Sequence, residues 1–181
     1  MRAFIGIPID NEAAKIIYQH TAHYQKLCGE LFLRLSQTSN YHITLSFLGN
    51  INSIQLMRLE DQFNQLSQHN LLGFNLKLIS ICPFPMTFPK VIAVMLQPNE
   101  ALNQLRQSVV SMVNVAGIFQ KKTKFIPHLT VARVNVVKGI SKPYYPLLEL
   151  HEEIYINQIN LYESQLLKSG AKYMPRLYFR W

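Results

Sequence analysis

The motif His-x-Thr lies within residues 41–49 of the chain, Tyr41-His42-Ile43-Thr44-Leu45-Ser46-Phe47-Leu48-Gly49. It occurs again 86 positions later (128 minus 42) within residues 127–133, Pro-His-Leu-Thr-Val-Ala-Arg. With six histidines and six threonines in 181 residues, composition alone predicts about 0.2 such motifs. A single copy would be typical of an ordinary strand histidine, but two copies in matching contexts indicate a repeated functional element.

Both stretches have the apolar, β-branched composition of strands and are flanked by turn-forming residues. Side chains two residues apart lie on the same face of a strand. We therefore expect His42, Thr44 and Ser46 to share one face, with Phe47 on the opposite, packing face. The same alternation places His128 and Thr130 together in the second stretch.

The length of 181 residues and the 49% hydrophobic content suit one domain, residues 1–181, with a substantial core. A formal net charge of +8 favours a polyanionic partner such as nucleic acid, although many proteins without such a partner are basic too. The two cysteines, Cys28 and Cys82, form no metal or disulfide pattern and indicate a reducing compartment. The apolar N-terminal run is too short for a signal sequence or a membrane span, so we expect a cytoplasmic protein.

Two long helices each stand between a strand and a His-x-Thr strand. Helices are expected after Asp10 or Asn11 up to Gly29, from Ser53 until residues 70–73, and from Pro98 to Val115. Strands are expected over residues 2–8, 31–35, 41–49, 74–80, 91–96, 127–133, 152–167 and 173–181, with prolines 83, 85 and 89 in a loop. The order predicts an α+β fold of two pseudo-symmetric lobes. Each lobe would be an antiparallel sheet with helices outside, and the active-site cleft would lie between them.

Two histidines that face each other across such a cleft can cut a phosphodiester by acid–base catalysis. A neutral imidazole takes a proton from the attacking water and an imidazolium donates one to the leaving oxygen, because the ordinary imidazole pKa is about 6.5. The threonine hydroxyls can donate to the nonbridging phosphate oxygens. This arrangement predicts a bell-shaped dependence of rate on pH, but it suits nucleophiles other than water as well.

The paired motifs resemble the two-histidine (2H) phosphoesterase superfamily, also known by its HxTx motif. The closer resemblance is to its RNA 2′,3′-cyclic phosphodiesterase branch, historically called 2′-5′ RNA ligase. Further similar stretches are residues 2–7 (RAFIGI), 40–49 (NYHITLSFLG), 83–92 (PFPMTFPKVI), 125–133 (FIPHLTVAR), 161–164 (LYES) and 170–173 (GAKY). The branch often has a tryptophan before the first motif, where this chain reads Phe-Leu-Arg-Leu at residues 32–35. Base stacking at that edge is therefore in question.

The resemblance implies a two-lobed fold that hydrolyses a terminal 2′,3′-cyclic phosphate on RNA to a 2′-phosphomonoester without metal or cofactor. It implies that His42 is the general acid and His128 the base, and that Thr44 and Thr130 bind the phosphate. Arg133 would be a further phosphate contact. Because Arg133 lies five residues after His128, only a bulge or a strand end could bring it to the same face.

Several other residues have two interpretations. Lys121, Lys122 and Lys124 could bind the RNA backbone or form a solvated strand face. Phe47 and Phe84 could stack on a base or pack, and for Phe47 the strand face favours packing. Tyr162 and Glu163, in the C-terminal signature, could contribute to the site or only support their strand. His20 and His23 have the spacing of helical metal ligands, but no acid or cysteine near them in sequence completes a set, so we predict no metal site.

Three functions stay open. The first is the cyclic phosphodiesterase, acting in RNA processing as a monomer on RNA with a cyclic phosphate end and without a membrane partner. The second is a related 2H enzyme that acts on 2′-5′-linked oligonucleotides or another cyclic nucleotide, including 2′-5′ RNA ligation. The third is a noncatalytic RNA-binding module, whose affinity would fall steeply with salt and would survive loss of His42.

Overall fold

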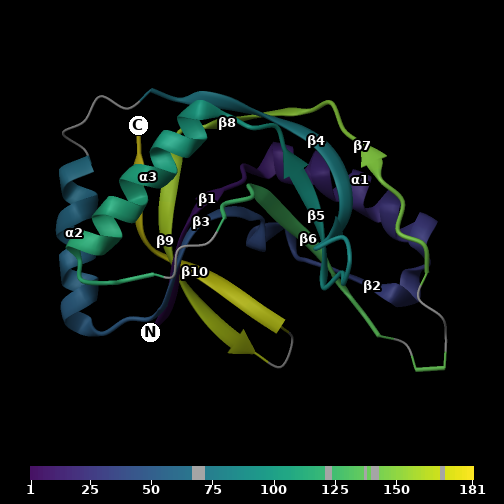
Figure 1. Ribbon diagram of the computed structural model, residues 1–181, viewed down its shortest axis with the longest axis horizontal. Helices are drawn as coiled ribbons and strands as arrows, with labels where there is room; N and C mark the ends of the chain where they lie inside the picture. The colour runs from purple at the N-terminus through teal and green to yellow at the C-terminus, as the bar shows by residue number, and fades with distance from the viewer. Residues whose placement is uncertain (67–71, 121–123, 137, 140–142, 168–169) are drawn as a thin grey trace.

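A computed structural model describes residues 1–66, 72–120, 124–136, 138–139, 143–167 and 170–181 (Figure 1). The helices are α1 (Asn11–Cys28), α2 (Ser53–Leu66) and α3 (Glu100–Val115), with 3₁₀ turns at Glu30–Phe32 and Thr38–Asn40. The strands are β1 (Arg2–Pro8), β2 (Leu33–Leu35), β3 (His42–Asn50), β4 (Phe74–Phe84), β5 (Val91–Leu96), β6 (His128–Val134), β7 (Leu148–Glu149), β8 (Glu153–Ile156), β9 (Gln158–Leu167) and β10 (Gly170–Arg180).

The strands form a continuous antiparallel sheet whose two halves meet between β3 and β6. Its order is β10-β9-β1-β3-β6-β5-β4-β7, with β2 beside β6 and β8 beside β4. β3 and β6 share only the pair of Ile43 with Leu129, whereas β1 and β3 are paired from end to end. Because so little of the ladder connects them, the halves diverge from this pair and form two lobes. The predicted α+β fold with one His-x-Thr strand in each lobe is confirmed.

Helices α1 and α3 each pack against the lobe that does not contain the strand preceding them in the chain. α1 follows β1 along the chain but packs against β2 and β6 of the other half, while α3 follows β5 and packs against β3. In Figure 1, α2 and α3 lie together beside β9, and α1 lies on the far side of the sheet near β7. Each strand–helix–strand repeat therefore spans both lobes, which ties them together more firmly than the single β3–β6 pair could.

The helix ends follow from local sequence. The Asp10 carboxylate accepts hydrogen bonds of 2.9 Å from the backbone N–H groups of Glu12 and Ala13 at the start of α1. Gly29 ends the same helix with a φ of 91°, which a residue with a side chain adopts only at a cost. Asn99 caps α3 through the N–H of Leu102 at 2.9 Å. The apolar faces of α1 and α3 repeat at helical spacing and are buried.

Two strand predictions were wrong. Residues 152–167 do not form one strand, because the chain changes partner at Asn157: β8 pairs with β4 in one lobe, and β9 pairs with β1 and β10 in the other. Pro83 lies within the β4–β5 ladder opposite Ile92, not in a loop. The pairing of β4 with β7 extends no further than Ile81. Beyond that point β4 is an edge strand, which tolerates the missing N–H of proline.

The described residues contain no helix long and apolar enough to cross a membrane. The core is built from the apolar faces of the sheet and the helices, and both cysteines are buried free thiols.

Candidate active site

A β-bulge in β3 decides which side chains accompany His42 and Thr44. Gly6 of β1 pairs with Thr44 and Ile5 pairs with Ser46, so Leu45 is an extra residue in the ladder. Leu45 and Ser46 are consequently buried in succession, and Phe47 returns to the face of Thr44, where it is 72% exposed. The expectation that Ser46 shares the histidine face and that Phe47 packs in the core was wrong, because simple alternation does not hold across a bulge.

β6 carries a bulge at the equivalent place. Thr130 pairs with Ala93 and Ala132 pairs with Ile92, which leaves Val131 as the extra residue. Val131 and Ala132 are both buried, and Arg133 is exposed on the side of Thr130. The bulge that Arg133 needed is therefore present, and Arg133 in one lobe corresponds to Phe47 in the other.

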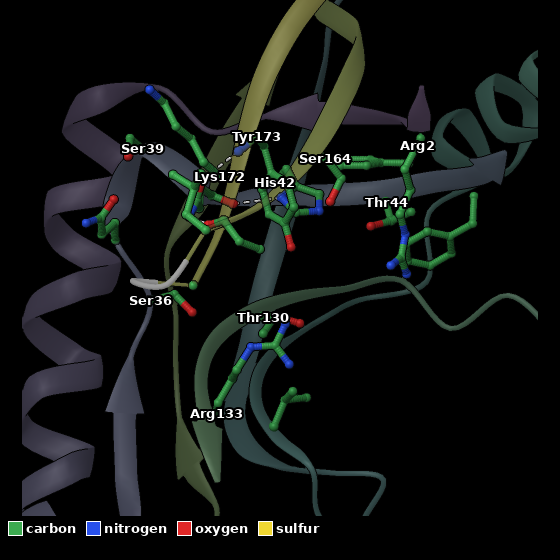
Figure 2. A pocket seen from close by; sticks show the side chains of 18 of the residues that line it. Arg2, Ser36, Ser39, His42, Thr44, Thr130, Arg133, Ser164, Lys172 and Tyr173 are labelled. Atoms are coloured by element: carbon green, nitrogen blue, oxygen red, sulfur yellow. Dashed lines mark hydrogen bonds between the residues drawn. The ribbon is translucent and has the colours of Figure 1, made fainter. Parts of the chain in front are cut away.

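Both motifs border one cavity. His42, Thr44, His128, Thr130 and Arg133 all line a space of about 850 Å³ (Figure 2). The pair of Ile43 with Leu129 explains this, since in an antiparallel ladder the next residues along set His42 across from Thr130 and Thr44 across from His128. The structure thus brings together the five residues that the sequence singles out, while their catalytic roles stay predictions.

The two histidine rings are held in the same way. His42 Nδ1 donates to the carbonyl oxygen of Asn40 at 2.7 Å, and His128 Nδ1 donates to that of Ile126 at 2.7 Å. A carbonyl oxygen can only accept, so Nδ1 carries a proton in both rings. Nε2 is then the nitrogen that can take up or release a proton at each site, and neither Nε2 has a hydrogen-bond partner among the described residues.

Comparison with known proteins agrees with this geometry. The LigT-like phosphoesterase family model matches residues 7–91, which include the first motif. The RNA 2′,3′-cyclic phosphodiesterase of Bacillus subtilis is 31% identical over 131 residues, which are 72% of this chain and 69% of the relative. The chain belongs to the LigT-like phosphoesterases. The family resemblance noted in the sequence is thereby confirmed.

Other similar proteins match this chain over nearly its whole length. The RNA 2′,3′-cyclic phosphodiesterase of Archaeoglobus fulgidus is 26% identical over 178 residues, 96% of each chain. Among solved structures, TT0787 of Thermus thermophilus superposes with a TM-score of 0.82 at 20% identity, covering 99% of this chain and 97% of that one. E. coli LigT complexed with 3′-AMP superposes with a TM-score of 0.75 at 23% identity, covering 99% and 97%. These two structural similarities concern the fold.

In this LigT-like chain, aromatic rings enclose His42. The ring centroid of Phe4 lies 4.6 Å from that of His42, and Tyr173 meets the same ring edge-on at 4.9 Å. Burial among these groups lowers the pKa of His42 from 6.5 to about 4; the bond to Asn40 opposes the change and the neighbouring His128 adds to it. Tyr162 stacks on Phe4 at 4.9 Å, so it supports this enclosure as well as its own strand.

Asn40 fastens the His42 side of the cavity to the β9–β10 hairpin. Its side-chain N–H₂ donates to the carbonyl of Ala171 at 2.9 Å, and its side-chain oxygen accepts from the N–H of Tyr173 at 3.3 Å. The backbone carbonyl of the same residue holds the His42 ring. Asn40 therefore couples the position of the hairpin to the position of the imidazole.

Positive charge surrounds the cavity. Arg2, Arg34, Arg133 and Lys172 line it, and no aspartate or glutamate does so among the described residues. Sequence reasoning missed Arg2, Arg34, Lys172 and Tyr173 as site residues. Only the strand pairings bring these positions to the motifs, although the similarity of residues 2–7 and 170–173 to the family was a usable signal.

The other candidate contacts are less central. Lys121 and Lys122 lie outside the described residues, and Lys124 is exposed but does not line the cavity. Phe84 also does not line the cavity; its ring centroid lies 4.4 Å from that of His128 at 33°, much as Phe4 lies against His42. Packing on the histidine is thus the contact that the structure gives Phe84.

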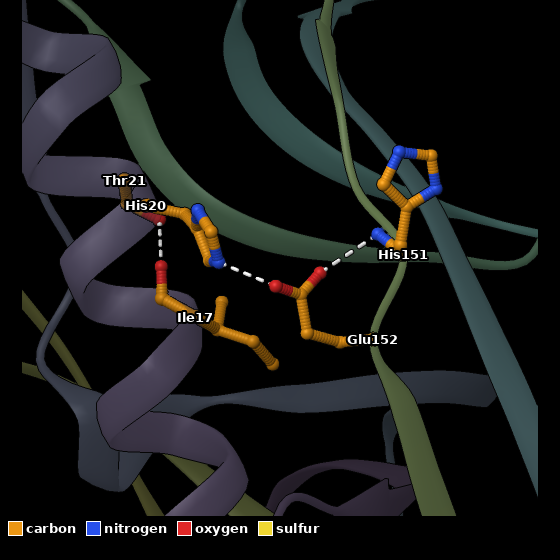
Figure 3. A network of polar contacts seen from close by, with 5 residues as sticks. All are labelled: Ile17, His20, Thr21, His151 and Glu152. Atoms are coloured by element: carbon orange, nitrogen blue, oxygen red, sulfur yellow. Dashed lines mark hydrogen bonds and ion pairs between the residues drawn. The ribbon is translucent and has the colours of Figure 1, made fainter.

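His20 has a structural partner. Its Nε2 lies 2.5 Å from the Glu152 carboxylate, which also accepts from the backbone N–H of His151 at 3.0 Å (Figure 3). Burial raises the pKa of Glu152, but the hydrogen bonds from the backbone and from His20 outweigh it, so the pKa is lowered. The contact links α1 to the segment before β8. Among the described residues no group of three or more metal-binding side chains occurs.

Proposed function

We propose that this LigT-like phosphoesterase hydrolyses the 2′,3′-cyclic phosphate at the end of an RNA chain and leaves a 2′-phosphomonoester. The observation that carries the proposal is the pair of equivalent histidines on one cavity, each with Nδ1 bound to a carbonyl and Nε2 without a partner among the described residues. The names of the B. subtilis and A. fulgidus relatives, both RNA 2′,3′-cyclic phosphodiesterases, support the substrate. The 3′-AMP bound to E. coli LigT is also a phosphorylated ribonucleotide.

The reaction needs one proton taken up and one released. His128 Nε2 accepts a proton from water as its oxygen attacks phosphorus, and the bond between phosphorus and O3′ breaks. His42 Nε2 donates its proton to O3′, which leaves as a hydroxyl group. The product carries the phosphate on O2′, and each histidine contributes roughly 10²–10⁴-fold to the rate.

Thr44 and Thr130 donate from their hydroxyl groups to the nonbridging oxygens, where negative charge increases in the transition state. Such a donor contributes about 3 kcal/mol to lowering a barrier. Arg133 adds a charged donor at one end of the cavity. Phe47, which is exposed on the opposite lobe, offers an aromatic face for the base of the terminal nucleotide.

The acid role of His42 requires that the bound substrate restore its proton. In the free protein the pKa of His42 is about 4, so the ring is neutral near pH 7. An anionic phosphate beside the ring favours the imidazolium and raises this pKa. The π-face of Phe4 also favours a cationic ring. Substrate binding and proton uptake by His42 are therefore coupled in this proposal.

The test is incubation with a short RNA that ends in a 2′,3′-cyclic phosphate, with a chelator present, followed by analysis of the product end. We expect a 2′-phosphate, full activity in the chelator, and a loss of at least about 10²-fold in His42→Ala and in His128→Ala. His23→Ala, which removes an exposed histidine of α1 outside the cavity, is the matched control and should keep full activity.

Each other result has a distinct meaning. A 3′-phosphate product would reverse the leaving group, and loss of activity in the chelator would require a metal. Cleavage of a 2′-5′-linked oligonucleotide in place of the cyclic end would favour the related 2H activity. Binding without cleavage, unchanged in His42→Ala, would favour the RNA-binding module. Because both cysteines are buried and unpaired, we place the enzyme in a reducing, cytoplasmic compartment.

A further inference from the structure

Two arginines stand directly opposite each other at one end of the cavity. The short strand β2 runs along β6 beyond the β3–β6 contact, and its register pairs Arg34 with Arg133. Directly opposed residues in an antiparallel pair have Cβ atoms about 5 Å apart and point to the same face. Both side chains are exposed and both line the cavity that holds His42 and His128.

This arrangement is unfavourable in the absence of an anion. Like charges directly opposite one another in a sheet are destabilising. Among the described residues neither guanidinium has a hydrogen bond or an ion pair, and no carboxylate lines the cavity. The same chain does neutralise an arginine elsewhere, since Arg176 Nε lies 3.1 Å from the Glu163 carboxylate. The charges at the cavity are thus available for an anionic ligand.

The distance of Arg34 and Arg133 from the two motifs indicates which phosphate of a bound RNA they would contact. Because Val131 is an extra residue in the ladder, Arg133 stands two ladder steps after Thr130, and at about 3.3 Å per step the backbones of Arg133 and of its partner Arg34 lie on the order of 7 Å along β6 from Thr130. Figure 2 shows the side chain of Arg133 extending toward Thr130. Arg34 reaches from the neighbouring strand, and the serine and glutamine that follow it, Ser36 and Gln37, also line the cavity.

We propose that Arg34, side by side with Arg133, binds the phosphate that joins the last nucleotide to the one before it. This inference rests on the proposed function, because it takes the cyclic phosphate to lie between the histidines. It makes Arg34 a specificity residue: the preferred substrate is an oligonucleotide end with at least two phosphates, not a nucleoside 2′,3′-cyclic monophosphate. A guanidinium can bind two phosphate oxygens at once, which a single lysine cannot match.

The experiment compares two substrates in three proteins. The substrates are a dinucleotide that ends in a 2′,3′-cyclic phosphate and a nucleoside 2′,3′-cyclic monophosphate. The proteins are the unmodified chain, Arg34→Gln, and Lys15→Gln, which removes an equal charge from the exposed surface of α1. For Arg34→Gln we expect kcat/KM on the dinucleotide to fall about tenfold or more, since charged hydrogen bonds are strong. On the mononucleotide it should stay within about twofold, and Lys15→Gln should change neither value.

Salt dependence gives an independent reading. Each phosphate contact on a single strand adds about 0.7 to the slope of log affinity against log salt. Arg34→Gln should lower that slope by about this amount for the dinucleotide and leave it unchanged for the mononucleotide. The melting temperature should not fall, because the substitution relieves repulsion between like charges.

Several results would overturn the inference. In Arg34→Gln these are an equal loss of kcat/KM on both substrates, no loss of kcat/KM on either substrate, or a lower melting temperature that accounts for the loss. If the unmodified protein cleaves neither substrate, the proposed function fails. In that case the role of Arg34 is decided by measuring the binding of a dinucleotide and of a mononucleotide that each end in a 2′-phosphate. Arg34→Gln must then weaken the binding of the dinucleotide and leave that of the mononucleotide unchanged.

Discussion

His42 should make the protein less stable as the pH falls. Its pKa is about 4 in the folded chain and near 6.5 in a solvated chain. Between these values the unfolded chain binds a proton that the folded chain does not, so the free energy of unfolding decreases as the pH is lowered. The contribution of His42 is fully present above pH 6.5 and is lost as the pH falls to about 4.

The size of the effect follows from the same values. The difference between 6.5 and about 4 corresponds to roughly 3 kcal/mol, since one unit of pKa is about 1.4 kcal/mol. The ring is half-buried and borders a cavity, so we expect about 2 to 3 kcal/mol. For a chain of this length, that corresponds to a decrease of roughly 5–10 °C in Tm.

Urea unfolding at pH values from 4 to 8 measures the effect in the unmodified protein and in His42→Asn, which cannot titrate. Between pH 7 and pH 4, the unmodified protein should lose about 2 to 3 kcal/mol more of its free energy of unfolding than His42→Asn does. Thr44→Val is the control: it alters the same cavity without removing a titrating group, so its curve should run parallel to that of the unmodified protein. Parallel curves for His42→Asn, or an NMR midpoint for His42 at 6.5 or above, would refute the reasoning. Added inorganic phosphate should raise that midpoint.

Three further perturbations test the support of the site. In Gly6→Ala the new Cβ would lie 3.0 Å from the carbonyl oxygen of Ile43 and 3.4 Å from Cδ2 of His42. The free energy of unfolding should therefore decrease by about 1–3 kcal/mol, and kcat should fall. An unchanged kcat would show that the His42 ring does not move. Asn40→Ala removes both side-chain bonds to the hairpin, so hydrogen exchange at the Tyr173 amide should accelerate and kcat/KM should fall; equal exchange rates would argue against the coupling. Asp10→Ala removes the cap of α1 and should lower stability by about 0.5–2 kcal/mol in thermal unfolding without changing kcat.

The local sequence predicts the helices well and singles out the two motifs that carry the proposed chemistry. Caps such as Asp10 and Asn99, and apolar residues repeated every three to four positions, are local signals, and the helix ends follow them closely. The two His-x-Thr motifs depend only on residues two apart in a strand. That spacing is short enough for His42 and Thr44 to share a face whatever the strand pairs with.

The residues further along each strand were not predictable in this way. Whether Phe47 faces the core or the cavity depends on the extra residue in β3, and a bulge exists only relative to the partner strand. The break at Asn157 has the same origin, because β8 and β9 are each defined by a different neighbour. A sequence lists side chains in order but does not state which strand lies beside which.

The amino-acid sequence by itself determined the helices and the two motif strands, and it singled out the proposed reacting groups, because these depend on residues within a few positions of one another. Tertiary structure alone decided that the two histidines share one cavity, that Arg34 faces Arg133, and that burial lowers the pKa of His42. The reason is physical: strand pairing and burial are set by partners distant in the chain, and no short stretch of sequence contains them.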